Sequence, residues 1–309
     1  MFSPTHFRFT SADRSSIACV RWDSQGTSRG VVQIAHGMGE YICRYYGLIE
    51  ALVSSGFTVY GNDHRGHGLT VLSPAQFGDF GEGGFDVLVE DMLWLNRIAK
   101  HECPFQPYLL LGHGMGSFAA QQFVLEHSAE IDGLILSGSG ALDGLARLAN
   151  SAPAGSNVLN ACFEPARTQF DWLSRDDAVV DKVMHNPLCF AQLQPASFAS
   201  LLAAAPRLSD LAGLRRIRKD LPIYVFSGSE DPVGQQLQGV RVLLDRYRRA
   251  GLKDISHDFY AGGRHEMLNE INREEVRERL LNWICLLLEK LKERDSGDFS
   301  EHLLQLQTV

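Results

Sequence analysis

A glycine-rich run at residues 112–116, with the sequence GHGMG, contains the first residues of this chain whose types and spacing suggest chemistry. The apolar residues 108–111 before it predict a buried strand, and residues 117–127 after it predict a helix. A strand, the pattern G-x-S-x-G and a helix form a nucleophile elbow, a sharp turn that exposes a serine hydroxyl. Every part of this elbow is present except the serine, because Gly114 stands at its position. The sequence therefore indicates a hydrolytic site whose nucleophile has been replaced, either by an engineer or by evolution.

Residues that could serve as acid and base follow the elbow in the order that such a site requires. Asp231 comes just after an apolar segment at 221–226, and His265 comes just after another strand-like segment at 255–260. In a catalytic triad the histidine removes the proton of the nucleophile, and the aspartate holds the imidazole in the correct tautomer. Taken alone, Asp231 could cap a turn and His265 could be an ordinary loop residue. Joined to the elbow, the two predict an acid and a base.

Two backbone amides are candidates for an oxyanion hole, which needs two N–H donors aimed at one point. One donor should belong to the residue after the nucleophile, which is Met115, and the other to the loop after the third strand. That loop contains residues 36–40, with the sequence HGMGE, and makes Met38 the candidate. The alternative is an ordinary glycine-rich turn between a strand and a helix.

A second polar cluster contains Asp63, His64 and His67, three residue types that can bind metals. No matching ligand pattern lies nearby, so we interpret this segment as a hydrogen-bonded loop. Ser117 is the serine nearest to the elbow, but it lies about one helical turn along and should not reach the nucleophile position. The sequence therefore predicts neither a metal ion nor a cofactor.

The composition of the 309 residues is ordinary for a globular protein, with 45% hydrophobic and 21% charged residues. A net charge of −8 argues against nucleic acid as a partner, because nucleic acids attract clustered Lys and Arg. The six cysteines form no C-x-x-C pair, which favours free thiols in a reducing compartment. No signal peptide is apparent, and the longest apolar runs, such as 284–288, are too short for an integral membrane segment. We expect a cytoplasmic protein; its oligomeric state is left open.

The elements that must position these residues alternate along the chain. Strands are predicted at residues 7–9, 17–22, 30–35, 57–60, 108–111, 134–136, 221–226 and 255–260, and helices at 44–55, 85–100, 117–127, 233–250 and 266–292. The first two strands form a hairpin. The remaining alternation of strands and helices predicts an α/β fold with a mostly parallel sheet and helices on both faces.

The alternation stops for about eighty residues in the second half of the chain. We therefore divide the chain into a core of residues 1–138 and 220–294, a helical cap of residues 139–219 and a C-terminal tail of residues 295–309. The cap should cover the carboxyl edge of the sheet, where open α/β sheets bind their ligands. The tail should be disordered or loosely docked.

Large apolar residues are frequent in the predicted cap. We take Phe163, Trp172 and Leu188 as candidates for substrate binding, in an acyl or aromatic pocket. The alternative is that these side chains only bury the cap against the core.

Taken together, these segments resemble the monoacylglycerol lipase and lysophospholipase branch of the α/β-hydrolases, which is often grouped with the serine aminopeptidases. The likeness runs from about residue 5 to about residue 290. It is carried by residues 36–40 with Arg44 and Tyr45, by residues 63–68, 112–116 and 263–270, and by the cap segments 173–176 and 186–188.

The resemblance implies an eight-stranded α/β-hydrolase fold and a small-molecule ester as substrate, cleaved through an acyl-enzyme. It implies Asp231 as the acid, His265 as the base, and Met38 and Met115 as oxyanion donors. Two residues depart from the branch: Tyr41 stands where a histidine is frequent, and Gly114 stands where the serine belongs.

Three hypotheses follow for the activity. The first is a carboxylic-ester hydrolase, acting on acylglycerols, lysophospholipids or other medium esters, with Gly114 as an inactivating replacement. The second is a natural pseudoenzyme that binds a ligand on the same scaffold. The third is another chemistry on this fold, such as acyl transfer, peptide cleavage or hydrolysis by water that His265 activates.

Overall fold

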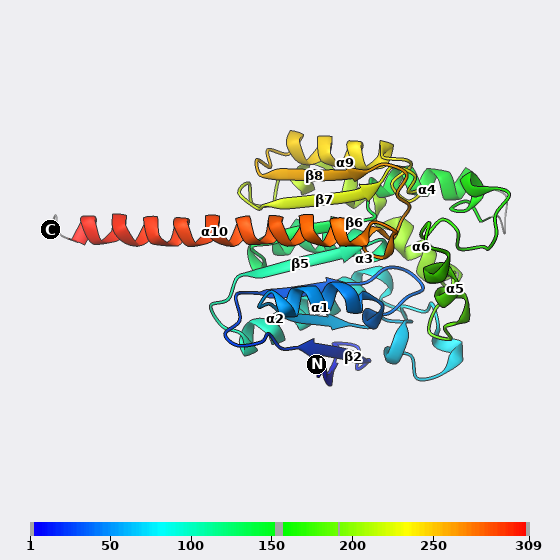
Figure 1. Ribbon diagram of the computed structural model, residues 1–309, viewed down its shortest axis with the longest axis horizontal. Coiled ribbons are helices and arrows are strands. Elements are labelled where there is room, and N and C mark those ends of the chain that lie inside the picture. The colour runs from blue at the N-terminus through cyan, green and yellow to red at the C-terminus, as the bar shows by residue number, and fades with distance from the viewer. Residues whose placement is uncertain (1–2, 152–156, 191, 307–309) are drawn as a thin grey trace.

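The computed structural model describes residues 3–151, 157–190 and 192–306, and an eight-stranded sheet lies at its centre (Figure 1). The strands are β1 (Thr5–Thr10), β2 (Ser16–Trp22), β3 (Val31–Ala35), β4 (Thr58–Asn62), β5 (Tyr108–His113), β6 (Gly133–Ser137), β7 (Ile223–Gly228) and β8 (Ile255–Tyr260). Their order across the sheet is β1-β2-β4-β3-β5-β6-β7-β8. β2 pairs antiparallel with β1 and β4, and all other pairs are parallel. The mostly parallel sheet predicted from the sequence is thereby confirmed.

Helices cover both faces of the sheet, which explains why every residue of β3 to β7 is buried. On one face the core is formed with α1 (Tyr46–Ser54) and α10 (Arg273–Leu306). On the other face it is formed with α2 (Gly84–Glu102), α3 (Met115–His127) and α9 (Gln238–Arg249). Both cores consist mainly of Val, Ile, Leu and aromatic side chains.

A helical insertion joins β6 to β7 and lies at the carboxyl ends of the parallel strands (Figure 1). It contains α4 (Leu142–Ser151), α5 (Asp177–His185), α6 (Pro195–Ala203), α7 (Ala205–Ser209) and α8 (Leu211–Leu214), and the described residues of this segment include no strand. The loops that follow β3, β5, β7 and β8 meet beneath it, and they carry the residues that the sequence suggests for chemistry.

Two predicted helix boundaries are wrong. α9 begins at Gln238 rather than at 233, because residues 235–237 have φ angles of 51°, 48° and 70°, which no right-handed helix accommodates. The predicted helix 266–292 is divided into the short 3-10 helix η6 (Met267–Asn269) and α10. Between them the carboxylate of Glu270 accepts the backbone N–H groups of Arg264 and Ile271, so this stretch is held as a turn.

The end of the chain also differs from the prediction. α10 continues to Leu306 and extends well beyond the sheet in Figure 1, whereas residues 295–309 were expected to be disordered or loosely docked. Leu, Glu, Lys and Arg, all good helix formers, dominate its sequence, and no proline interrupts it. Residues 307–309 lie outside the described part. Among the described helices, none combines the length and the apolar character that crossing a bilayer requires.

Candidate active site

The turn between β5 and α3 has the backbone of a nucleophile elbow. Gly114 has φ 53° and ψ −118°, a conformation that side chains rarely adopt. The residues two positions before and after it must be glycine. A Cβ at Gly112 would lie 2.4 Å from the carbonyl oxygen of Gly116, and a Cβ at Gly116 would lie 2.2 Å from that of Ala35. The strand and helix can therefore approach closely only with this sequence.

The structure brings Asp231 and His265 together although 34 residues separate them. Nδ1 of His265 lies 3.0 Å from Oδ1 of Asp231, and the two side chains are buried, with 5% and 0% exposed. The same carboxylate oxygen accepts the N–H of Val233 at 2.9 Å, which fixes its orientation. The cap also holds the backbone of this residue, because the backbone N–H of His265 donates to the backbone carbonyl of Trp172 at 3.3 Å.

The other ring nitrogen of His265 faces the elbow. A Cβ added at Gly114 would lie 2.9 Å from Nε2 and 3.4 Å from Cε1 of that imidazole. A serine at this position would therefore stand directly against the imidazole, which would have to give way by a few tenths of an ångström. Ser117, in contrast, uses its hydroxyl to bond the carbonyl of Gly114 at 2.6 Å and the hydroxyl of Ser139 at 2.7 Å, and it is fully buried.

Two imidazoles lie side by side at this point, and their electrostatics differ. Burial lowers the pKa of His265, but the charge and hydrogen bond of Asp231 outweigh it, so that this pKa is raised above its ordinary value. Burial and the nearby His265 lower the pKa of His113 to about 4. Their ring centroids are 4.5 Å apart. Of the two, His265 is therefore the one that can accept a proton near neutral pH.

In the loop after β3 the amide of Met38 differs from those of the two glycines beside it, because it is left for a ligand. The N–H of Gly37 donates to Oε1 of Glu40 at 2.5 Å, and the N–H of Gly39 donates to Nε2 of His67 at 3.1 Å. Within the described residues no acceptor is bonded to the amide of Met38, nor to that of Met115 at the first turn of α3. Both residues line the same cavity as Gly114.

A buried arginine connects the loop after β3 to the loop that carries the base. Arg44 donates to Oε2 of Glu40 at 2.7 Å and to both carboxylate oxygens of Glu266 at 2.6 and 2.7 Å. Tyr45 donates its hydroxyl to Glu40 at 2.6 Å. Burial raises the pKa of Glu266, but Arg44 overrides it and lowers that pKa to about 2. The sequence gives no sign of this role for Arg44, which stands out there only as part of the resemblance.

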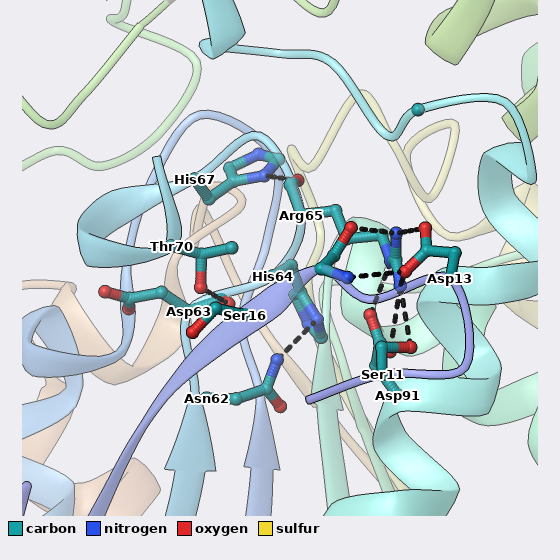
Figure 2. Close-up of polar contacts among 12 residues, drawn as sticks. Ser11, Asp13, Ser16, Asn62, Asp63, His64, Arg65, His67, Thr70 and Asp91 are labelled. Carbon is teal, nitrogen blue, oxygen red and sulfur yellow. Dashed lines mark hydrogen bonds and ion pairs between the residues drawn. The ribbon is translucent and has the colours of Figure 1, made fainter. Parts of the chain in front are cut away.

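The loop after β4, which carries His64 and His67 (Figure 2), is hydrogen-bonded to the loop after β3 and supports it. Nε2 of His36 accepts the N–H of His64 at 2.9 Å, and Nδ1 of His36 donates to the carbonyl of Gly37 at 2.7 Å. His67 uses its two nitrogens in the same way, toward Gly39 and the carbonyl of Arg65. Burial lowers the pKa of His36 and of His67 to about 3. These imidazoles are neutral hydrogen-bonding groups.

Arg65 fixes this loop to the rest of the core, as Figure 2 shows. Its guanidinium donates to Asp91 of α2 at 2.6 Å and to Ser11 at 2.8 Å, and it also pairs with Asp13. Asp63 accepts the N–H of Ile42 at 2.8 Å, which joins the two loops directly. The elbow, the base and the amide donors are thus supported by neutral imidazoles and paired charges.

A cavity of about 100 Å³ opens from Gly114 and His265 toward the cap. Its apolar lining is formed by Phe118, Leu145, Ala149, Val158, Leu159, Trp172, Leu173, Phe198, Leu201 and Val233. Of the three predicted substrate contacts, Trp172 is part of this lining, and its ring centroid is 4.9 Å from that of His265. Phe163 lies outside it, with the guanidinium of Arg264 over its ring, and Leu188 lies outside it in the turn after Asn186. The periodicity of α4 could have indicated Leu145 and Ala149.

A larger cavity of about 330 Å³ lies at the opposite edge of the sheet, under α10. It is lined by Pro222, Asp254, Ser256, Trp283, Leu286, Leu287, Glu289, Lys290 and Glu293. Its described lining includes no imidazole or thiol, and the amino ends of β7 and β8 border it. The chemically equipped cavity is therefore the smaller one.

Known proteins resemble the chain over most of its length. The serine aminopeptidase S33 family matches residues 26–272. The monoacylglycerol lipase of Mycolicibacterium smegmatis is 28% identical over 265 residues, which cover 85% of this chain and 90% of that protein. The human monoglyceride lipase is 26% identical over 265 residues, which cover 84% and 83%. A solved structure of a highly thermostable carboxyl esterase from Bacillus coagulans, in complex with glycerol, is 27% identical with a TM-score of 0.84, and the match covers 93% of this chain and 100% of that one.

Proposed function

The chain belongs to the serine aminopeptidase S33 family and to the lipase- and esterase-like hydrolases, and we propose that its site is that of a carboxylic-ester hydrolase with Gly114 at the nucleophile position. The observation that carries the proposal is the position of His265, whose Nε2 lies 2.9 Å from where a Cβ of residue 114 would be. Asp231 supports the opposite nitrogen of the ring.

In the serine form of this site, the hydroxyl at position 114 attacks the ester carbonyl while His265 takes its proton. Asp231 holds the imidazole and stabilises its charged form. The amides of Met38 and Met115 donate to the oxygen that becomes negative, and the acyl-enzyme forms. Water activated by the same imidazole then releases the carboxylic acid.

The substrate class that we propose is an ester with an apolar acyl chain, such as a monoacylglycerol or a lysophospholipid. What supports it is the lining of the 100 Å³ cavity, whose walls beyond the elbow are leucine, phenylalanine, tryptophan and other apolar side chains. The similarity to the monoacylglycerol lipase of Mycolicibacterium smegmatis and to the human monoglyceride lipase favours the first of these esters. Gly114 then removes the serine nucleophile from an otherwise complete site.

A natural pseudoenzyme that binds such a ligand is the second candidate, and Gly114 itself is the observation that favours it. The variant Gly114→Ser separates the two. We expect its rate with a p-nitrophenyl ester to exceed that of the parent chain by orders of magnitude, because the base, the acid and the amide donors already surround the position. A Gly114→Ser protein that folds but is no faster than the parent would support the pseudoenzyme.

A further inference from the structure

The site retains His265 and Asp231 as a general base and its support, although position 114 has no serine hydroxyl for them to activate. We infer that the chain as it stands hydrolyses reactive esters directly, with His265 removing a proton from a water molecule beside Gly114 and with no acyl-enzyme. This inference rests on the proposed ester chemistry of the site but adds a different nucleophile and a different reaction sequence. It assigns an activity to the glycine form itself.

No hydroxyl, thiol, amine or free carboxylate of the described site can replace the missing serine. The described lining of the cavity includes no serine, threonine, cysteine or lysine. Its two carboxylates, Glu40 and Glu266, are both bonded to Arg44. Ser117 is fully buried, and its hydroxyl donates to the carbonyl of Gly114. A covalent intermediate on another hydroxyl, thiol, amine or carboxylate is therefore excluded for the described part of the site, and an acyl-imidazole is the covalent alternative that the test must detect.

Nε2 of His265 faces the cavity beside Gly114. Nδ1 of His265 is bonded to Asp231, whereas Nε2 has no partner among the described residues and points toward Gly114, which also lines the cavity. The cavity measures about 100 Å³, and a single water molecule needs only about 10–15 Å³ of such volume. Because residue 114 has no Cβ, water can approach Nε2 from the side that a serine would fill.

The remaining groups meet the needs of a single displacement. The water oxygen forms a bond to the ester carbonyl carbon, its proton passes to Nε2 of His265, and the amides of Met38 and Met115 hold the resulting oxyanion. The oxyanion then collapses, the bond to the leaving alkoxide breaks, and the proton on Nε2 passes to that alkoxide. The products are one carboxylic acid and one alcohol, and His265 is neutral again.

The test compares initial rates of p-nitrophenyl butyrate hydrolysis for the parent chain, Gly114→Ala and His265→Ala, all purified identically. We expect the parent to exceed the buffer rate, and His265→Ala to lose about 10²-fold of the catalysed rate, the usual contribution of a general base. Gly114→Ala should also lose most of the rate, because its methyl group would lie 2.9 Å from Nε2 in the path of the water. If the absence of a hydroxyl were all that mattered at this position, Gly114→Ala and the parent would have equal rates.

The matched control is His101→Ala, which removes an exposed imidazole at the end of α2 and should leave the rate unchanged. A second readout does not depend on whether Gly114→Ala folds. With added methanol, a common acyl-enzyme gives one ratio of methyl ester to acid for all leaving groups, whereas direct displacement gives ratios that vary with the leaving group. Intact-protein mass measured during turnover should show no acyl adduct on the parent chain.

Each outcome decides between the alternatives. Equal rates for the parent and His265→Ala, a parent rate no higher than buffer, or an acyl adduct on the parent would overturn the direct mechanism. If Gly114→Ser is nevertheless active, the proposed ester hydrolase stands and only this inference fails. If Gly114→Ser is inert as well, the proposed function fails too.

Discussion

Replacing Arg44 by methionine should destabilise the protein by about 3–5 kcal/mol at pH 7, because removing one partner of a buried ion pair leaves an uncompensated charge. Arg44, Glu40 and Glu266 are all buried, with 10%, 5% and 4% of their side chains exposed. The lowered pKa of Glu266 gives a magnitude of the same order. A change from 4.5 to about 2 corresponds to about 3 kcal/mol of interaction that favours its charged form.

The effect should depend on pH in a defined direction. Because the folded-state pKa of Glu266 is depressed, its stabilisation is fully present above the unfolded value of about 4.5 and is lost as the pH falls toward 2. In Arg44→Met, burial would act on Glu266 without the arginine that outweighs it, with only the smaller effects of His113 and Asn269 opposing it, and would raise its pKa relative to the parent. This carboxyl would therefore take up a proton more readily in mild acid. The difference in unfolding free energy between parent and variant should therefore shrink as the pH falls from 7 to 4.

Urea unfolding followed by tryptophan fluorescence measures this difference at each pH. Arg44→Lys keeps the charge but loses the two parallel bonds to Glu266, and it should show a smaller loss. Adding Glu40→Gln and Glu266→Gln to Arg44→Met removes the unpaired charges and should restore part of the stability. The reasoning is refuted if Arg44→Met unfolds within 0.5 kcal/mol of the parent at pH 7, or if the difference is the same at pH 7 and pH 4.

Two further predictions concern the base and the elbow. In the Gly114→Ser background, turnover should rise with pH and reach half its maximum above pH 6.5, because a general base must be neutral and the pKa of His265 is raised. Adding His265→Ala should abolish this turnover. A midpoint below pH 6.5, or an active alanine variant, would contradict the assignment of His265 as the base. Gly116→Ala should destabilise the parent by about 1–3 kcal/mol in thermal unfolding, because its Cβ would lie 2.2 Å from the carbonyl oxygen of Ala35. The control is Gly213→Ala, whose Cβ would have its nearest neighbour at 3.3 Å. Equal melting temperatures for the two variants would refute this prediction.

The sequence predicted the parts of the site that depend on local patterns. The elbow at 112–116 and the loops of Asp231 and His265 each follow a strand, so their meeting at the carboxyl edge follows from the parallel sheet itself. Most of the eight strands were likewise recognisable from apolar runs, whereas β1 and β8 mix apolar with polar residues. The placement of each candidate residue at the carboxyl end of a strand could be inferred without knowledge of contacts between distant residues.

The sequence could not predict contacts between residues far apart in the chain. Arg44 and Glu266 are 222 residues apart, and neither lies in a periodic pattern that would point to the other. The start of α9 depends on three left-handed residues that carry ordinary side chains, so their types gave no warning. In the cap, apolar residues that line the cavity and those that lie outside it, such as Leu188, are of the same kinds. Only the fold distinguishes them.

The hydrogen bonds from the cap to the base have a consequence for chimaeric proteins. The carbonyls of Trp172 and Leu173 accept the backbone N–H groups of His265 and Glu266 at 3.3 and 2.8 Å. A transplanted insertion from a relative, designed to change chain-length preference, would replace the very segment that holds the imidazole in register. Exchanges that stop before residue 172 and resume after residue 176 would keep this clamp, whereas a whole-insertion graft would misalign the base even with every triad side chain in place.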